Sequence, residues 1–183
     1  AVSSAATASS SSWIIAWEAV VSIFAALKAG AVFSPVNPST KPDKLSYVVS
    51  NCRAAAILTQ GRLLSVVIEA GKGRETVQQT MVANAGKGKL PDGYASFEAA
   101  CDTPCAPPPR SGINLDLAML IYTSGSAGFP KGVMMTHQNI DAATTSITTY
   151  LGNTSNDVIL VALPISFDYG LYQVLMAAKL GAT

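Results

Sequence analysis

Charged residues are scarce in this sequence. Asp, Glu, Lys and Arg make up only 13% of the 183 residues, whereas about 25% is usual for a soluble domain. Apolar residues make up 49%. Two interpretations fit: a membrane protein, or part of a larger protein whose remaining chain covers some apolar surface. The net charge of +1 gives no argument for nucleic acid or an anionic membrane surface as a partner.

Long apolar runs are also missing. A membrane-spanning helix needs about 20 consecutive apolar residues. The best candidate, WIIAWEAVVSIFAALKAGAVF, is interrupted by Glu18 and Lys28, and it is typical of an amphipathic helix followed by a strand. The N-terminus has no basic segment before an apolar run. The sequence therefore predicts neither a membrane span nor a secretory signal.

Metal-ligating residues are few. The chain has one histidine, His137, and three cysteines, Cys52, Cys101 and Cys105. The usual Cys/His zinc sets cannot be completed from these residues, so we expect no metal site, and we expect His137 to be structural. Free thiols and a cytoplasmic location are expected, with a disulfide between Cys101 and Cys105 as the alternative.

Helical patterns alternate with short apolar strands from residue 13 onward. Helices are predicted over 13–29, from Pro42, over 62–69, and after a cap at Thr136. The strands read AVFSPV, AAAILT, LAMLIYTS, KGVMMT and DVILVALP. This alternation predicts a three-layer α/β fold with a largely parallel sheet flanked by helices. The Ser/Ala-rich residues 1–12 predict a low-complexity tail or linker, and a proline-rich connector is expected near 103–112.

One loop, YTSGSAGFPKG at residues 122–132, stands between two predicted strands. Its three glycines allow close backbone approach, its hydroxyls and backbone N–H groups suit an anion, and Lys131 adds a positive charge. The spacing is not that of a Walker A loop, because Lys131 comes three positions after Gly128 and a strand follows. The glycine spacing of a dinucleotide fingerprint is absent as well. The residues favour a polyphosphate-binding loop, with a β-hairpin-like connector as the alternative.

The order of residues in YTSGSAGFPKGVMMTHQNI resembles the signature [YF]-T-S-G-[ST]-T-G-x-P-K-G-V-x-x-[ST]-H-x-N of the adenylate-forming enzymes. This superfamily includes AMP-forming acyl-CoA synthetases, aryl-CoA ligases, firefly luciferase and the adenylation domains of nonribosomal peptide synthetases. The stretches LKAGAVFSPVNP and LPISFDYG resemble further family segments. The resemblance implies that residues 13–183 are part of an N-terminal ATP- and acid-binding domain.

The resemblance also implies site residues. ATP with Mg²⁺ is the implied cofactor, and Lys131 is the implied catalytic cation. The implied phosphate-binding residues are Thr123, Ser124, Gly125, Ser126, Ala127, Gly128 and Lys131. The implied substrate-pocket residues are Phe167, Asp168, Tyr169 and Gly170. The family usually has threonine where this chain has Ala127, so we expect weaker ATP binding from the missing hydroxyl.

The implied activity is that of an AMP-forming acid–thiol ligase. Such an enzyme converts a carboxylic acid and ATP to an acyl-adenylate and pyrophosphate, and then transfers the acyl group to a thiol such as coenzyme A or that of a carrier protein. One alternative is a peptide-synthetase adenylation domain, in which Asp168 would pair with the substrate ammonium. Another is a non-catalytic binding module on the same fold. The family's later segments, including its Mg²⁺-binding Glu and its C-terminal lysine, are not in these residues. We therefore expect the chain to depend on the remainder of a longer protein and to be inactive alone.

Overall fold

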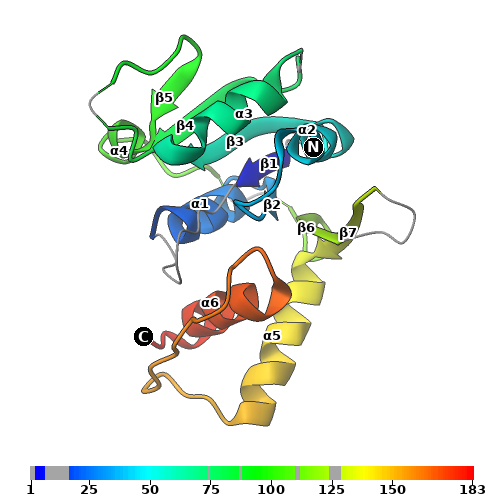
Figure 1. Cartoon of the computed structure of the whole chain (residues 1–183). Helices are drawn as coiled ribbons and strands as arrows, with labels where there is room; N and C mark the ends of the chain where they lie inside the picture. The colour runs from blue at the N-terminus through cyan, green and yellow to red at the C-terminus, as the bar shows by residue number, and fades with distance from the viewer. Residues whose placement is uncertain (1–2, 7–16, 74, 87, 110–111, 124–128) are drawn as a thin grey trace.

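The computed structural model of the chain describes residues 3–6, 17–73, 75–86, 88–109, 112–123 and 129–183. One seven-stranded sheet runs through the molecule in the order β5-β4-β3-β1-β2-β6-β7 (Figure 1). The strands are β1 (Ser3–Ala6), β2 (Val32–Pro35), β3 (Ala54–Gln60), β4 (Gln79–Ala83), β5 (Tyr94–Ser96), β6 (Leu117–Thr123) and β7 (Lys131–Thr136). All neighbouring pairs are parallel except β6 and β7, which are antiparallel.

Helices pack on both faces of this sheet. They are α1 (Trp17–Lys28), α2 (Pro42–Asn51), α3 (Leu64–Gly71), α4 (Phe97–Cys101), α5 (His137–Leu151) and α6 (Asp168–Leu180), with a short 3₁₀ turn, η1 (Gly61–Leu63). On one face, α1, α5 and α6 form a core around Phe33, Met119 and Leu171. On the other, α2 and α3 pack on β3 around Val49 and Ile57. The predicted three-layer fold with a largely parallel sheet is confirmed.

Local signals set several helix boundaries. Pro42 is in the first turn of α2, where its fixed φ fits and no N–H is needed. Gly30 follows α1 with a φ of +67°, a left-handed conformation that favours glycine and ends a helix. Thr136 caps α5 as predicted, since its hydroxyl accepts a hydrogen bond from Asn139 N at 3.1 Å and its own N–H donates to Asn139 Oδ1 at 3.0 Å. Such a reciprocal cap satisfies two backbone donors at the start of the helix.

Four residues within the predicted tail over residues 1–12 belong to the sheet. Ser3–Ala6 form β1, which lies between β2 and β3 and pairs with both in parallel. Low-complexity composition argues against an independent hydrophobic core, but a strand that is paired on both sides obtains its backbone hydrogen bonds from its neighbours. Residues 7–12 lie outside the described part of the chain.

The strand predicted for DVILVALP is wrong. Residues 157–164 form no helix or strand. Two backbone hydrogen bonds connect this segment to the distant residue Thr183. Thr183 N donates to Asp157 O at 3.1 Å, and Ile159 N donates to Thr183 O at 2.7 Å. Val158 and Leu160 are each 81% exposed. Strand propensity alone does not make a strand where no adjacent strand supplies a full set of bonds.

A proline-rich connector was expected near residues 103–112. The described residues of that range, 103–109 and 112, contain no helix or strand. Among the helices that the structure describes, none has the length and apolar character needed to cross a membrane.

Candidate functional site: a hairpin loop and an apolar pocket

The predicted phosphate loop connects the antiparallel strands β6 and β7. Thr123 ends β6 and Lys131 begins β7, and these two residues are paired in register. Both are exposed. The five remaining residues of the predicted phosphate set, Ser124, Gly125, Ser126, Ala127 and Gly128, lie outside the described residues. The described geometry therefore places one hydroxyl residue and one cation opposite each other at the two ends of the loop.

Gly132 has a specific reason to be glycine. It pairs with Tyr122 across the hairpin, and a Cβ on Gly132 would lie 3.2 Å from Cζ of that tyrosine. A side chain at position 132 would press on the ring next to the loop. The glycine of the PKG segment thus leaves room for Tyr122, which packs against the core formed by α2, α3 and β3.

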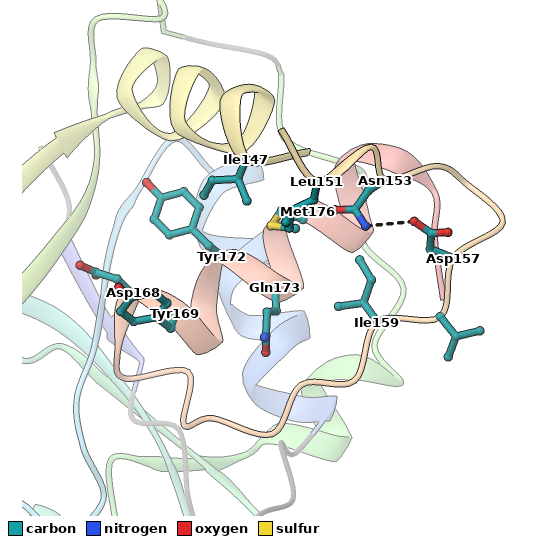
Figure 2. Close-up of a pocket in the computed structure, with 11 residues that line it drawn as sticks. Ile147, Leu151, Asn153, Asp157, Ile159, Asp168, Tyr169, Tyr172, Gln173 and Met176 are labelled. Atoms are coloured by element: carbon teal, nitrogen blue, oxygen red, sulfur yellow. Dashed lines mark hydrogen bonds between the residues drawn. The ribbon is translucent and has the colours of Figure 1, made fainter. Parts of the chain in front are cut away.

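A pocket of about 900 Å³ lies between the end of α5, the segment after it and the start of α6 (Figure 2). Its walls are mostly apolar, with a few polar side chains from α6 and from the segment after α5. The lining residues are Ile147, Leu151, Asn153, Asp157, Val158, Ile159, Asp168, Tyr169, Tyr172, Gln173 and Met176. A mostly apolar cavity with a few polar groups is the usual form of a small-molecule site.

The structure divides the four predicted pocket residues into two pairs. Asp168 and Tyr169, in the first turn of α6, line the pocket. Phe167 and Gly170 are not among the lining residues. Phe167 precedes the helix at its N-cap position, whereas Gly170 is buried. A Cβ on Gly170 would collide with the carbonyl oxygens of Leu163 and Pro164, so this glycine permits close packing of the preceding segment on α6.

Tyr172 is a pocket residue that sequence reasoning missed. It lies one helical turn after Asp168 and is 9% exposed. Burial raises the pKa of Tyr172, and the negative charge of Asp168 raises it further. Its hydroxyl has no hydrogen-bond partner among the described residues, nor have Gln173 Oε1 and Asn153 Oδ1. Three lining residues of this pocket therefore carry buried polar atoms that could pair with a bound molecule or water.

Helical spacing was the signal that could have found these residues. Asp168, Tyr172 and Met176 are four positions apart on α6, and Ile147 and Leu151 are four apart on α5. Residues at i and i+4 share one helix face. Once Asp168 is placed in a pocket, the next two turns of the same face belong to its wall (Figure 2).

The structure does not bring the loop and the pocket together into one cavity, because no described residue of 122–132 lines the pocket. Within the described ranges, no group of three or more His, Cys, Asp or Glu side chains could hold a metal ion. Mg²⁺ prefers carboxylate, water and phosphate oxygens. A Mg²⁺ ion held largely by phosphate and water oxygens would not require such a group of protein ligands.

Comparison with known proteins decides the family. The sequence pattern of the AMP-binding enzyme family matches residues 16–183. The chain belongs to this family. Phosphinothricin tripeptide synthetase PhsC from Streptomyces viridochromogenes is 35% identical over 170 residues, which are 91% of this chain and 14% of PhsC. Human mitochondrial malonate–CoA ligase ACSF3 is 31% identical over 166 residues, which are 90% of this chain and 27% of that ligase.

A solved AMP-binding structure agrees on the fold. The anthranilate CoA ligase AuaEII, solved with anthranoyl-AMP, superposes with a TM-score of 0.83 at 21% identity. The match covers 100% of this chain and 35% of that ligase. The chain thus spans much less than two thirds of the AMP-binding relatives that it matches. The family match and the α/β fold confirm the resemblance to adenylate-forming enzymes.

Proposed function

We propose that this chain supplies ATP- and acid-binding parts of an enzyme that activates an amino acid as its adenylate. The observation that carries the proposal is the position of Asp168 in the pocket of α5 and α6. Asp168 is an exposed residue at the wall of this largely apolar pocket, and its carboxylate has no salt-bridge partner among the described residues. An ammonium group of an amino acid bound in the pocket would pair with this carboxylate, because the two groups carry opposite charges.

The environment of Tyr172 supports this assignment. Burial raises the pKa of Tyr172, and the charge of Asp168, one helical turn earlier on α6, raises it further. The similarity to a tripeptide synthetase supports the same class of substrate. The side chain of the amino acid would contact the apolar wall formed by Ile147, Leu151 and Met176.

The glycine-rich loop between β6 and β7 would act on ATP, the second reactant. In adenylate formation a carboxylate oxygen attacks the α-phosphorus of ATP, and the bond between that phosphorus and the β-phosphate oxygen breaks to release pyrophosphate. Negative charge grows on the departing pyrophosphate. Lys131 and the backbone N–H groups of a glycine-rich loop are suited to stabilise that charge. Transfer of the acyl group to a carrier-protein thiol would follow.

A CoA-dependent acid–thiol ligase is the second candidate. The malonate–CoA ligase similarity and the apolar pocket wall favour it. The two candidates differ in what Asp168 does, because a fatty or aryl acid has no ammonium group to pair with it.

Binding of matched acids to the chain separates the candidates. We would measure calorimetric affinities, with ATP present, for L-phenylalanine against 3-phenylpropionate and for L-leucine against 4-methylpentanoate. Asp168→Asn should weaken binding of each amino acid about tenfold, as loss of a hydrogen-bonded charge partner implies, and leave the deaminated acids unchanged. Asp43→Asn is the matched control, since Asp43 is the acidic residue in the first turn of α2.

Three results would change the proposal. Equal effects of Asp168→Asn on both members of each pair would exclude the ammonium contact. Preferential binding of the deaminated acids would favour the acid–thiol ligase. A chain that binds acids but shows no affinity for ATP would support a non-catalytic binding module.

A further inference from the structure

Two side chains of α2 contact the two ends of the glycine-rich loop. Asn51 is the last residue of α2 and Tyr47 lies one turn before it, so both are on one face of the helix. The hydroxyl of Tyr122 donates a hydrogen bond to Asn51 Oδ1 at 2.6 Å. The rings of Tyr47 and Phe129 are 5.1 Å apart between centroids. Tyr122 precedes the loop and Phe129 follows residues 124–128, so each contact holds a different end.

The contact at Tyr122 is built into the hairpin. The ring lies over Gly132 on the opposite strand, which leaves room for it. The ring is half-buried. Burial, with smaller contributions from nearby Cys52 and Tyr47, raises the pKa of Tyr122 to about 12. The hydroxyl therefore keeps its proton at neutral pH and remains a donor to Asn51.

The contact between Phe129 and Tyr47, unlike that of Tyr122, is not explained by burial of the ring in the core. Phe129 is 67% exposed, so burial of its ring contributes little to the stability of the fold. Its described ring contact is with Tyr47, at an interplanar angle of 34°. This ring contact with α2 restricts the position of the Phe129 backbone, which leads to Lys131.

We propose that Tyr47 and Asn51 are positioning residues that hold the two ends of the loop in the arrangement that binds ATP phosphates. This inference rests on the proposed role of the loop in phosphate binding. Neither side chain would contact the nucleotide. Fixing both ends reduces the conformational freedom that the loop loses when a ligand is bound.

The test uses the 183-residue chain and two pairs of variants on α2. Asn51→Leu removes the acceptor, and Asn51→Asp retains one. Tyr47→Leu removes the ring, and Tyr47→Phe retains it. Ser50→Ala, at an exposed α2 position between them, is the control. Three quantities are measured: the ATP dissociation constant, amide hydrogen exchange at Thr123, Phe129 and Gly132, and the thermal midpoint.

Asn51→Leu and Tyr47→Leu should each weaken ATP binding about threefold to tenfold, the effect of losing one contact of hydrogen-bond strength. Exchange should become faster by a similar factor, at Thr123 and Gly132 in the first variant and at Phe129 in the second. We expect ATP affinity and amide exchange close to those of the unmodified chain in Asn51→Asp, Tyr47→Phe and Ser50→Ala.

A lower thermal midpoint with unchanged ATP affinity and unchanged exchange at these amides would show a merely structural role and overturn the inference. The same conclusion follows if Asn51→Asp and Tyr47→Phe bind ATP as weakly as the two leucine variants do. If the unmodified chain shows no affinity for ATP, the proposed phosphate role fails. In that case unchanged exchange overturns the anchoring of the loop ends, and faster exchange supports it.

Discussion

The side-chain amide of Asn84 donates a 2.7 Å hydrogen bond to the carboxylate of Glu18, 66 positions earlier in the chain. Glu18 lies in α1 and is only 8% exposed. Asn84 follows β4 with a φ of +52°. This bond connects α1 to the end of β4, and it pairs a carboxylate that burial would otherwise leave unsatisfied.

Replacement of Asn84 should separate its two contributions to stability. Asn84→Gly removes the bond to Glu18 but tolerates the positive φ, and we expect a loss of roughly 1.5–3 kcal/mol for a bond to a charged group. Asn84→Ala also introduces left-handed backbone strain, which adds about 1–2 kcal/mol. Urea unfolding of both variants gives the two free energies. Equal stability of the two variants would argue against the strain, and unfolding free energies unchanged from the parent chain would argue against the bond.

Glu98 should make the fold sensitive to acid. Its carboxylate accepts hydrogen bonds from Asn84 N at 2.7 Å and from Ser96 Oγ at 2.8 Å. These bonds, the one from Asn84 first, lower the pKa of Glu98 below the usual range of a glutamate. The folded state then binds this proton less tightly than the unfolded state. The stabilisation is therefore present above the unfolded pKa and lost as the pH falls through the folded pKa.

Glu98→Gln should flatten the decline in unfolding free energy in this acid range. Urea midpoints measured from neutral to acid pH give the slope, and Glu75→Gln is the matched control because Glu75 is exposed. An equally steep decline in Glu98→Gln and the parent chain would contradict the prediction.

Gly170→Ala should destabilise the start of α6. The added methyl group would meet the carbonyl oxygens of Leu163 and Pro164, and backbone atoms cannot rotate away as side chains do. Overpacking of this kind costs about 1–3 kcal/mol. Gly71→Ala is the control, since nothing lies within 4 Å of a Cβ at the end of α3. Thermal denaturation should show a lower midpoint for the first variant only.

Ala127→Thr should tighten ATP binding. The family signature has threonine at this position, and a hydroxyl that bonds a phosphate is worth roughly 1.5–3 kcal/mol, or about tenfold or more in affinity. Ala127→Val adds the same branched shape without the hydroxyl. Calorimetric ATP titrations of the two variants isolate the hydrogen bond. The prediction fails if threonine and valine change the affinity equally.

Local features of the fold were predictable from the sequence. The start of α2 at Pro42, the end of α1 at Gly30 and the cap of α5 at Thr136 depend on residues within one helical turn. Strands were harder to predict than helix ends. Ser3–Ala6 join the sheet although their composition is that of a linker, and 157–164 form no strand although their composition is apolar. Whether a segment becomes a strand depends on neighbours distant in the sequence.

The same limit applies to the candidate site. The order of residues around Lys131 identified the family and the loop, and Asp168 was found from the same resemblance. The bond from Tyr122 to Asn51 joins residues 71 positions apart, and no periodicity in the sequence indicates it. Tyr172 was within reach, because helical spacing from Asp168 points to it.

The pairing of Thr123 with Lys131 has a thermodynamic consequence. A linear peptide with the sequence of residues 122–132 would lose chain entropy when its two ends approach each other around a triphosphate, and that loss opposes binding. In this chain the β6–β7 ladder brings the ends together during folding. The peptide should therefore bind ATP more weakly than the folded chain even though it contains every residue of the motif.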